Sequence, residues 1–357
     1  MHLAKPPVTG RRARFAVVGC GRIASNHFEA LKAHAQSAEL VAVCDRDPAA
    51  LGAAVARTGA IGFSSLTSLL AAHPAHGAPD CVVLATPSGL HPQQAIEIAR
   101  AGIDVMTEKP MATRWADGLA MVRACDEAGV RLFVVKQNRR NRTLQLLKQA
   151  VTKGRFGRIY MVNVNVFWSR PQSYYDSAAW RGTWEFDGGA FMNQASHYVD
   201  LLDWIVGPVE SVMAYTGTLA RDIEVEDTGV AALKWRNGAI GSINVTMLTH
   251  PKNFEGSITI LGENGTVRIG GVAVNDIQHW AFDTPHTMDD TIKDASYETT
   301  SVYGYGHPLY YDNVIKTLRG EAQPETDGRE GLKSLELLIA MYLSARDGKR
   351  INLPLAY

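Results

Sequence analysis

The sequence lacks the charge imbalance and the long apolar runs that mark several large classes of protein. Its 357 residues carry 36 Lys and Arg against 36 Asp and Glu, so the formal net charge is zero and the pI is near 7.2. Without an excess of positive charge, the chain has no general attraction for nucleic acid or for an anionic membrane surface. The longest apolar run, Leu337–Leu343, is far shorter than the roughly 18 residues of a membrane-spanning helix. We therefore expect neither nucleic acid nor membrane as a partner.

Cysteine is also scarce. The four cysteines at positions 20, 44, 81 and 125 show no CxxC or metal-ligand spacing, which argues against a disulfide scaffold and fits a reducing cytosol. The basic N-terminal segment is followed by only four apolar residues, Phe15–Val18, too few for the roughly 7–15 residues of a signal-peptide core. The histidines and acids of Gly270–Tyr305, with nearby His307, show no ligand spacing either. We expect a cytoplasmic protein without a metal, and a structural role for that segment.

The first 136 residues alternate short apolar runs with helical patterns. The runs are rich in Val and do not alternate in polarity, which is typical of strands buried on both faces. The predicted strands are Arg14–Val18, Leu40–Cys44, Cys81–Ala85, Asp104–Thr107 and Leu132–Val135. The predicted helices are Ile23–Ala35, Pro48–Thr58, Pro92–Ala101 and Arg114–Ala128. Alternation of this kind predicts an α/β domain over residues 1–136, a doubly wound parallel sheet of the Rossmann type.

From about residue 155 the pattern changes to longer, β-branched runs. These predict strands at Ile159–Trp168, Val209–Thr218, Gly229–Trp235, Ile240–Thr246 and Ser257–Leu261. The pairs Asn237-Gly238 and Asn264-Gly265 favour tight hairpin turns, so we expect a large, mostly antiparallel open sheet. Helices are predicted near His197–Val206, ending at Gly207-Pro208, and at Leu309–Arg319 and Arg329–Asp347. Residues 137–357 thus form a second, α+β domain, assigned to substrate binding and oligomerisation.

A glycine-rich turn follows the first predicted strand. Gly19-Cys20-Gly21-Arg22-Ile23-Ala24 fits G-x-G-x-x-G/A, in which Gly19 permits the tight turn and Gly21 lets a pyrophosphate approach the backbone. Asp45 closes the second strand, where a carboxylate accepts the ribose hydroxyls of NAD and repels the 2′-phosphate of NADP. The neighbouring Arg46 complicates that choice, because an arginine can bind the phosphate. The alternative is a plain turn beside a surface acid; the order strand, turn, helix and acid favours NAD.

Two further loops follow later strands, at the edge where open α/β sheets bind ligands. One runs from Thr86 to His91 and the other is Thr107-Glu108-Lys109-Pro110. Lysine is a compact donor whose pKa shifts readily when it is desolvated, so Lys109 suits the polarisation of a reacting hydroxyl. Each loop alone is compatible with a surface turn.

Together with Asp187-Gly188-Gly189-Ala190 and Asn193-x-x-x-His197-x-x-Asp200, these motifs resemble the Gfo/Idh/MocA oxidoreductase family over nearly the whole chain. The segments Arg170–Asp176 and Trp180–Trp184 are similar to those of the UDP-N-acetylglucosaminuronate 3-dehydrogenases of the WlbA and WbpB type. The resemblance implies NAD-dependent oxidation of the C3 hydroxyl of UDP-N-acetylglucosaminuronic acid to the 3-keto sugar. It also implies a role in the synthesis of bacterial lipopolysaccharide, including diacetamido-uronic acid, and assembly as a homotetramer.

The resemblance implies Lys109 and His197 as the catalytic pair. Family members commonly carry an acid four residues before this histidine, whereas this chain has Asn193, so the proton must be handled by His197 or Lys109 without a carboxylate relay. The alternative for His197 is a satisfied core histidine. The residues expected to bind the cofactor are Gly19, Gly21, Arg22, Ile23, Asp45, Thr86, His91, Glu108, Lys109, Gln137, Trp168 and Arg170. Those expected to bind the substrate are Lys109, Arg170, Arg181, Asn193 and His197.

A diphosphate and a carboxylate need cations and an aromatic surface, and two segments supply them. Arg170 and Arg181 stand among Trp168, Tyr174 and other aromatics, while Lys136–Arg140 with Arg142 form a second cationic cluster. A solvated loop with interface aromatics is the alternative. Two other functions stay open: an NAD-dependent dehydrogenase of a free sugar or inositol, which needs no diphosphate site, and a non-catalytic NAD-sensing regulator on the same fold.

Overall fold

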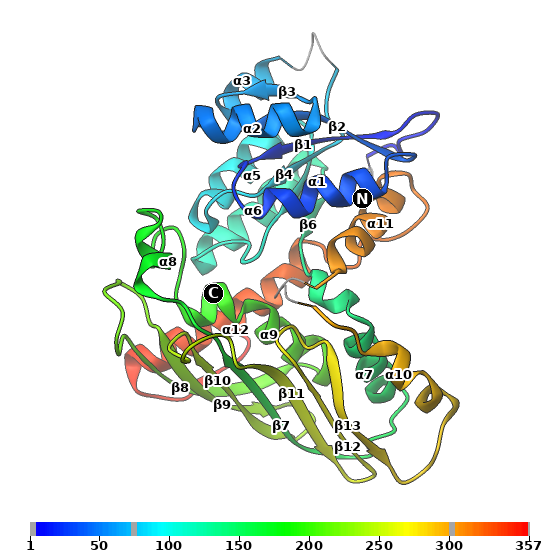
Figure 1. Ribbon diagram of the computed structural model, residues 1–357, viewed down its shortest axis with the longest axis vertical. Coiled ribbons are helices and arrows are strands. Elements are labelled where there is room, and N and C mark those ends of the chain that lie inside the picture. The colour runs from blue at the N-terminus through cyan, green and yellow to red at the C-terminus, as the bar shows by residue number, and fades with distance from the viewer. Residues whose placement is uncertain (1–4, 73–76, 300–303, 356–357) are drawn as a thin grey trace. The chain divides into compact units, whose positions relative to one another are not determined.

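The computed structural model describes residues 5–72, 77–299 and 304–355, shown as ribbons in Figure 1. They form two compact units, each built around its own sheet. The first unit comprises the chain up to Lys136 together with His307–Leu332, and the second comprises Gln137–Gly306 and the chain from Lys333.

The sheet of the first unit is parallel throughout. Its strands are β1 (Ala13–Val18), β2 (Ala38–Cys44), β3 (Ile61–Phe63), β4 (Cys81–Leu84), β5 (Asp104–Thr107) and β6 (Leu132–Val134). They lie in the order β3-β2-β1-β4-β5-β6, the doubly wound order predicted from the alternating pattern. β4 and β5 are buried at every residue, as non-alternating apolar runs require. β3 was not predicted, because its three residues include a glycine and an exposed Ile61.

Helices cover both faces of this sheet (Figure 1). They are α1 (Ala24–Ala33), α2 (Pro48–Thr58), α3 (Leu66–Ala71), α5 (His91–Arg100), α6 (Trp115–Ala128) and α11 (Gly306–Leu318), with a 3-10 turn at Ser88–Leu90. The predicted bounds of α2 are confirmed and have a local cause. Asp47 accepts from the backbone of Ala49, Pro48 occupies the first turn, and Gly59 ends the helix in the left-handed region at φ +70°.

The segment His307–Leu332 differs from its assignment by sequence to the second domain. The apolar residues Tyr311, Val314 and Leu318 of α11 pack in one core with Phe15 of β1 and Phe133 of β6. An apolar helical stripe shows that a helix is buried, but it does not show which sheet the helix covers.

The second sheet has eight strands and is mostly antiparallel, as predicted. Its strands are β7 (Ile159–Phe167), β8 (Val209–Gly217), β9 (Thr228–Trp235), β10 (Ile240–Thr246), β11 (Glu255–Gly262), β12 (Gly265–Gly270), β13 (Asp276–Phe282) and β14 (Ile351–Asn352). The order is β13-β12-β11-β7-β10-β9-β8-β14, and β7 pairs with β10 in parallel. Gly238 in the predicted β9–β10 turn has φ +89°, the conformation that the Asn-Gly pair favours. In β9 buried and exposed residues alternate, so one face of the sheet packs against the core and the other faces outward.

The helices of the second unit lie along one face of its sheet (Figure 1). They are α7 (Arg142–Thr152), α8 (Gln172–Asp176), α9 (Ser196–Leu201), α10 (Ile292–Ala295) and most of α12 (Gly328–Asp347). The predicted helix His197–Val206 is only partly regular. α9 is flanked by two π-helical segments, Ala190–Gln194 and Leu202–Val206, and the chain leaves the second at Gly207, as predicted. π-Helical turns are rare and concentrate at functional sites, which draws attention to this segment.

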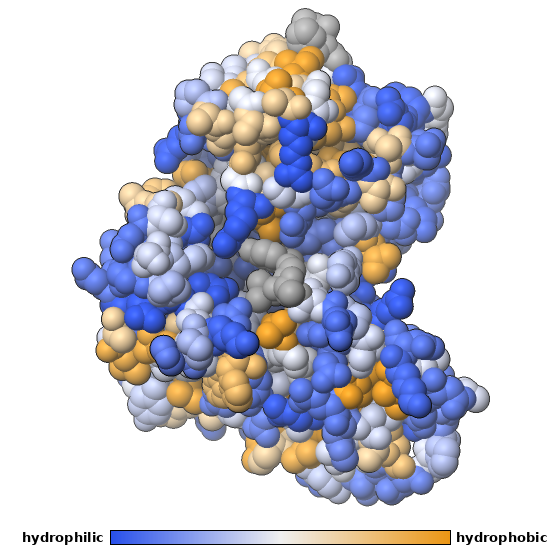
Figure 2. Space-filling view, in the orientation of Figure 1, coloured by the Kyte–Doolittle hydropathy of each residue, from blue (hydrophilic) through white to orange (hydrophobic). Residues whose placement is uncertain are grey.

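Within the described ranges, no helix has the length and apolar character needed to cross a bilayer. The face of the molecule in Figure 2 is mainly hydrophilic, with small apolar areas between the charged ones.

Candidate active site

In the first unit, the predicted cofactor residues follow strands that end level with one another. Val18, the last residue of β1, is in register with Cys44 of β2 and with Leu84 of β4, which in turn pairs with Thr107 of β5. The turns that carry Gly19, Asp45, Thr86 and Glu108 therefore leave the carboxyl edge of the sheet side by side. This edge is where open parallel sheets bind their ligands.

The glycine-rich turn meets the requirements of a pyrophosphate site. Gly19 has φ +94°, and a Cβ there would stand 2.6 Å from the backbone of Ala85, so only glycine fits. A Cβ on Gly21 would meet nothing within 4 Å, which leaves room for a ligand to approach the backbone. No side chain caps the first turn of α1, and the positive end of the helix dipole there favours an anion. The turn thus fits the cofactor predicted from the sequence.

Asp45 holds this turn in place. Its Oδ2 accepts a hydrogen bond from the backbone N–H of Cys20 at 2.7 Å, and its Oδ1 accepts from Asp47 at 2.9 Å. Each carboxylate oxygen has a second lone pair, so these bonds leave acceptors for ribose hydroxyls. Asp45 therefore shapes the glycine turn in addition to its predicted role.

His91 connects the loop that begins at Thr86 with the loop Thr107–Pro110. Its Nε2 lies 2.9 Å from the carbonyl oxygen of Thr86, and its Nδ1 lies 3.1 Å from that of Pro110. The ring is buried, and burial lowers the pKa of His91 although both carbonyls favour the protonated form. The Thr86 hydroxyl donates to Gln94 at 2.6 Å. Because both ring nitrogens contact protein carbonyls, the structure gives His91 a structural function that the cofactor prediction did not include.

Glu108 lies in a buried cluster directly before Lys109. Its Oε1 is 3.2 Å from Nε2 of His27 and 3.3 Å from Nε2 of His307, and its Oε2 accepts the backbone N–H of Lys109 at 3.1 Å. His27 in turn contacts the Tyr311 hydroxyl through Nδ1 at 2.9 Å. Burial alone raises the pKa of Glu108, but the two histidines hold that pKa well below its usual value; burial also lowers the pKa of His27.

This cluster places His307, for which the sequence predicted a structural role, against Glu108 and close to His27. One ligand atom each from His27, Glu108 and His307 lie within 4.8 Å of one another, a grouping of metal-ligand type that spacing in the sequence could not reveal. Protein groups already face both nitrogens of the His27 ring: the Tyr311 hydroxyl faces Nδ1 and the Glu108 carboxylate faces Nε2.

In the second unit, His197 lies on α9 and contacts Gln137. Nε2 of His197 is 2.9 Å from Nε2 of Gln137, and both residues are buried. An amide N–H that donates to Nε2 keeps this nitrogen as the acceptor and places the ring proton on Nδ1. Gln137 was predicted to bind the cofactor; the structure places it on the proposed catalytic histidine.

Asn193 lies one turn before His197 and has a carboxylate partner that the sequence did not indicate. Its amide nitrogen donates to Oδ1 of Asp187, which is 1% exposed. The other oxygen of Asp187 accepts the backbone N–H of Gly182 at 2.8 Å. The Gly188-Gly189 turn brings the two side chains together: Gly188 has φ +78°, and a Cβ on Gly189 would collide with the carboxylate of Glu226.

In the cationic segment Lys136–Arg140, one arginine has a partner inside the second unit. Arg139 forms a bidentate, buried ion pair with Asp200, with both N–O distances at 2.7 Å, and its guanidinium lies over the ring of Trp204. Its prediction as part of a diphosphate-binding cluster is therefore wrong for Arg139, whose charge is matched inside the unit. Asp200, the last residue of the His197 motif, fixes α9 to this segment.

Arg170 and Arg181 form a continuous stack with the aromatic residues around them. Arg170 lies over Trp168 and Tyr174, and Arg181 lies over Tyr174 and Trp180, at 4.4 to 5.4 Å from the ring centroids. Nη1 of Arg170 donates to the carbonyl of Ser169 and to Asn253. Nε1 of Trp168 and Nε of Arg181 are buried without a hydrogen-bond partner among the described residues. The stack confirms that these residues form one cluster and offers cationic and aromatic surface to a ligand.

Two family models match the chain. One, described as "Oxidoreductase family, NAD-binding Rossmann fold", matches residues 13–136, and the other, "Oxidoreductase family, C-terminal alpha/beta domain", matches residues 148–353. The chain belongs to the Gfo/Idh/MocA oxidoreductase family. It is an oxidoreductase with an NAD-binding Rossmann domain, and both the resemblance and the expected cofactor are confirmed.

Within the family, two solved structures are similar to this chain over its whole length. The WlbA dehydrogenase of Chromobacterium violaceum, in complex with NADH and UDP-GlcNAcA, is 72% identical with a TM-score of 0.94, and covers 99% of this chain and 100% of its own. That of Bordetella pertussis, also in complex with NADH and UDP-GlcNAcA, is 71% identical with a TM-score of 0.95, and covers 98% and 100%. A D-apiose dehydrogenase of Paraburkholderia graminis is 27% identical over 97% of this chain and 91% of its own length.

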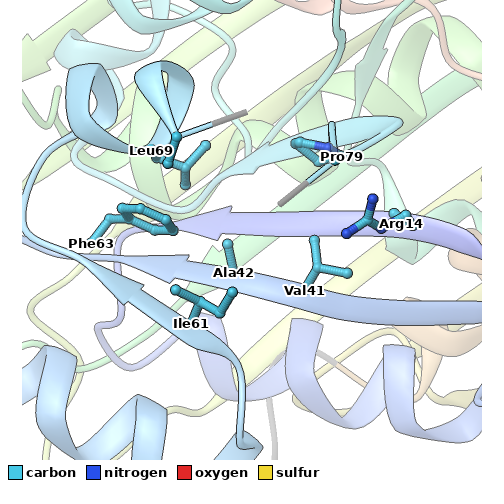
Figure 3. Close-up of a pocket in the computed structure, with 9 residues that line it drawn as sticks. Arg14, Val41, Ala42, Ile61, Phe63, Leu69 and Pro79 are labelled. Carbon is cyan, nitrogen blue, oxygen red and sulfur yellow. The ribbon is translucent and has the colours of Figure 1, made fainter. Parts of the chain in front are cut away.

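A small pocket in the first unit has no connection with these residues. Figure 3 shows side chains of β1, β2 and β3 facing α3, with Phe63 and Leu69 at one end and Arg14 and Pro79 at the other. None of the predicted site residues lines it. It is a gap beneath a short edge helix, and the family motifs lie at the carboxyl edge of the sheet.

Sequence reasoning missed three kinds of supporting residue: Asp187 beside Asn193, the histidines beside Glu108, and Glu226. Glu226 is buried against the Gly188-Gly189 turn, where Oε1 accepts from the backbone N–H of Phe191 and from the hydroxyl of Tyr342, each at 2.9 Å. His27 had a signal in the sequence, as a histidine inside a predicted apolar helix that must find a partner, and Asp187 stood in a family motif without an indicated partner.

Proposed function

We propose that this chain is an NAD-dependent dehydrogenase that oxidises the C3 hydroxyl of UDP-N-acetylglucosaminuronic acid to the 3-keto sugar. One observation carries the proposal: two proteins more than 70% identical over the full chain are WlbA dehydrogenases in complex with NADH and UDP-GlcNAcA. The residues that the sequence singles out for this chemistry, Lys109 and His197, are both present. The glycine turn and Asp45 fit the cofactor.

We assign the proton to His197. The contact of its Nε2 with the Gln137 amide favours the neutral ring, which is the form a general base needs. In the oxidation, the substrate hydroxyl takes the place of the Gln137 amide at Nε2 of His197, which carries the only lone pair of the neutral ring, and gives its proton to that atom. The C3–O bond becomes a carbonyl, and the C3 hydrogen leaves as a hydride with its electron pair. Bound NAD supplies the acceptor for that hydride.

Lys109 is assigned to the developing charge on the C3 oxygen. An ammonium group stabilises an alkoxide, and its effect is largest where water is excluded. The backbone of Lys109 is held by Glu108, whose carboxylate accepts its N–H. Lys109 thus comes from a loop with a fixed main chain.

The stack of Arg170 and Arg181 is assigned to the anionic parts of the substrate. Guanidinium groups on aromatic rings keep their outer N–H donors for phosphate or carboxylate oxygens. The buried, unpartnered Nε of Arg181 and Nε1 of Trp168 are donors, within the described part of the chain, that a bound ligand would satisfy. Asn193 is assigned to the sugar. Arg170 and Trp168 are also retained as contacts of the cofactor.

The test begins with calorimetric titration of UDP into the NAD-saturated protein, followed by NADH absorbance with UDP-N-acetylglucosaminuronate. We expect saturable UDP binding and NADH formation. D-apiose, inositols and free hexoses serve as controls, because D-apiose dehydrogenases are relatives. NADH from these sugars without UDP binding would favour a free-sugar dehydrogenase. UDP and NAD binding without hydride transfer in a single turnover would favour an NAD-sensing regulator.

His197→Asn and Lys109→Met test the two assigned roles. Each should lower kcat by at least about a hundredfold, the usual contribution of general acid–base catalysis. UDP affinity should stay unchanged, since neither residue is assigned to the nucleotide. Full activity of His197→Asn would refute the assignment of the base.

We further propose that the enzyme acts in the cytoplasm, in lipopolysaccharide synthesis, as a homotetramer. Support for assembly comes from the outer face of the second sheet, which exposes large apolar residues on adjacent strands. They are Met161 of β7, Met213 and Tyr215 of β8, Val230 of β9 and Ile240 of β10. Exposed apolar patches of this kind mark protein interfaces. Light scattering during gel filtration measures the assembly, and Tyr215→Glu should reduce it.

A further inference from the structure

The proposed function leaves one contact of the second unit without a role, the hydrogen bond between Asp187 and Asn193. Asp187 is 1% exposed, which is unusual for a carboxylate, and its oxygens accept from Asn193 and from the backbone N–H of Gly182. Asn193 is half-buried and lies one helical turn before His197. A buried charge is expensive unless its acceptors are satisfied, so this arrangement calls for a reason.

The contact determines which way the Asn193 amide points. A carboxylate offers acceptors only, so it pairs with the amide nitrogen and repels the amide oxygen. The usual ambiguity between the oxygen and nitrogen of an asparagine is therefore removed here. Oδ1 of Asn193 is directed away from Asp187.

The contact also determines where the negative charge lies. The Asp187 carboxylate accepts hydrogen bonds from two N–H groups, and position 193, four residues before His197, carries a neutral amide. A carboxylate at 193 would favour the protonated form of His197, whereas an amide does not. The pair thus provides a fixed acceptor near His197 without a charge.

We propose that Asp187 is a positioning residue that orients the Asn193 amide as an acceptor for a hydroxyl or amide N–H of the substrate while keeping charge away from His197. The proposal rests on the proposed function, because it takes His197 as the base. It assigns to Asp187 a role in substrate recognition and in the pH range of the reaction. A ligand group that lacks a donor at this point would bind less well.

The structure predicts how the two positions tolerate exchange. Asn193→Asp alone places two carboxylates in contact, one of them buried, so one must take up a proton or the turn must open. Asp187→Asn alone leaves two amides, which can pair in either orientation. The exchange Asp187→Asn/Asn193→Asp restores one acid and one amide with the roles reversed, and the amide oxygen introduced at position 187 can still accept from Gly182.

The experiment compares these three variants with the wild type in thermal unfolding, in KM and kcat for UDP-N-acetylglucosaminuronate, and in the pH dependence of kcat/KM. Asp187→Asn should raise KM about tenfold with a smaller change in kcat, since a charge-assisted hydrogen bond is lost. Asn193→Asp should lose about a hundredfold in kcat/KM and lower Tm, since two carboxylates then share one site. The exchange variant should recover most of the Tm.

The pH profile separates positioning from a structural role. In the exchange variant the carboxylate stands beside His197, so the acid limb of kcat/KM should move to higher pH. A purely structural pair would restore Tm and leave the limb in place. The proposal is overturned by an unchanged KM in Asp187→Asn, or by an exchange variant whose limb coincides with that of the wild type.

A failure of the proposed function gives a different result. In that case the wild type forms no NADH from the UDP-sugar, or His197→Asn keeps its activity. The coupling of positions 187 and 193 is still measured by the Tm values of the four proteins. Asp312→Asn, which makes the same change at an exposed carboxylate paired with Lys316 on α11, is the matched control and should leave KM, Tm and the pH limb unchanged.

Discussion

Two buried carboxylates support the proposed catalytic residues, and their partners differ. Glu108, directly before Lys109 in the first unit, faces the imidazoles of His27 and His307. Asp200, three residues after His197 in the second unit, faces the guanidinium of Arg139 in a bidentate pair. Imidazole changes its charge near neutral pH, whereas guanidinium keeps its charge at every pH that a folded protein experiences. The contacts of Glu108 with the two histidines therefore depend on pH, whereas the guanidinium that faces Asp200 keeps its charge.

A third buried carboxylate extends the comparison. Glu226 has hydrogen-bond donors but no cationic partner within the part of the chain that the structure describes; burial raises its pKa to about 7, while the bonds from Phe191 and Tyr342 act in the opposite direction. The three acids show that the charge of a buried carboxylate is set by its partner: ionised against a cation or an imidazole, and readily protonated when only neutral donors are present.

The largest effect is expected from Asp200→Asn. It leaves the buried Arg139 without its counter-ion, so the free energy of unfolding should fall by about 3–5 kcal/mol. The loss should be similar at pH 5.5 and pH 8.5, because the guanidinium of Arg139 keeps its charge throughout that interval. Urea unfolding followed by tryptophan fluorescence measures it. The double variant Arg139→Met/Asp200→Leu is the control and should lose less than the single one; a loss below about 1 kcal/mol in Asp200→Asn would break the comparison.

Glu226→Gln should stabilise the protein at alkaline pH. The folded-state pKa of about 7 lies above the ordinary value of 4.5, so the folded state binds the proton more tightly and loses stability as the pH rises from 4.5 through 7. The amide avoids that cost, which amounts to about 3 kcal/mol at pH 8.5. Tm should rise at pH 8.5 and change little at pH 5. Equal Tm shifts at both pH values would show that Glu226 is ionised throughout.

His27→Gln should lower stability by about 1 kcal/mol at pH 8, where the ring is neutral and its contacts with Tyr311 and Glu108 are lost. The pH dependence is more informative. The folded-state pKa of His27 lies below its ordinary value of 6.5, so wild-type stability falls as the pH drops below 6.5, because the unfolded chain binds the proton first. The variant should lack this component. His91 contributes in the same direction in both proteins, so the difference between their Tm curves isolates His27. Parallel curves would contradict the prediction.

The smallest effect is expected from Gln137→Leu. The residue is fully buried and leucine has a similar volume, so stability should change little. Loss of the amide contact makes protonation of His197 easier, and the acid limb of kcat/KM should move up by up to about one pH unit. Gln145→Leu, which removes a bond to the Arg139 carbonyl, serves as a comparison away from His197. A limb that moves down instead would mean that the Gln137 amide accepts from the histidine.

The prediction from sequence was most accurate where the structure is local. β5 and β10 have the predicted bounds, and so does α2, which carries its own start and stop residues. The glycine turn lies between strand and helix as its motif requires. In contrast, the predicted helix at His197 is interrupted by two π-helical segments, because their wider turns depend on packing that periodicity does not encode.

Residues distant in sequence account for most of what was missed. Phe133 shares a buried core with Tyr311, which returns to the first unit about 180 residues later, after strands β7 to β13 of the second sheet. The contact of Asn193 with Asp187 spans only six residues, yet it depends on the φ of Gly188 and on the space beside Gly189. Neither condition can be read from residue types alone.

The sequence by itself determined the two-sheet architecture, the cofactor turn, and the residue types available for the chemistry, because periodicity, glycine turns and helix ends are local properties. Only the tertiary structure decided the state in which those residues act. Whether a carboxylate is ionised, whether a histidine ring is neutral, and which way an amide points depend on the groups that surround them, and folding brings those groups from distant parts of the chain.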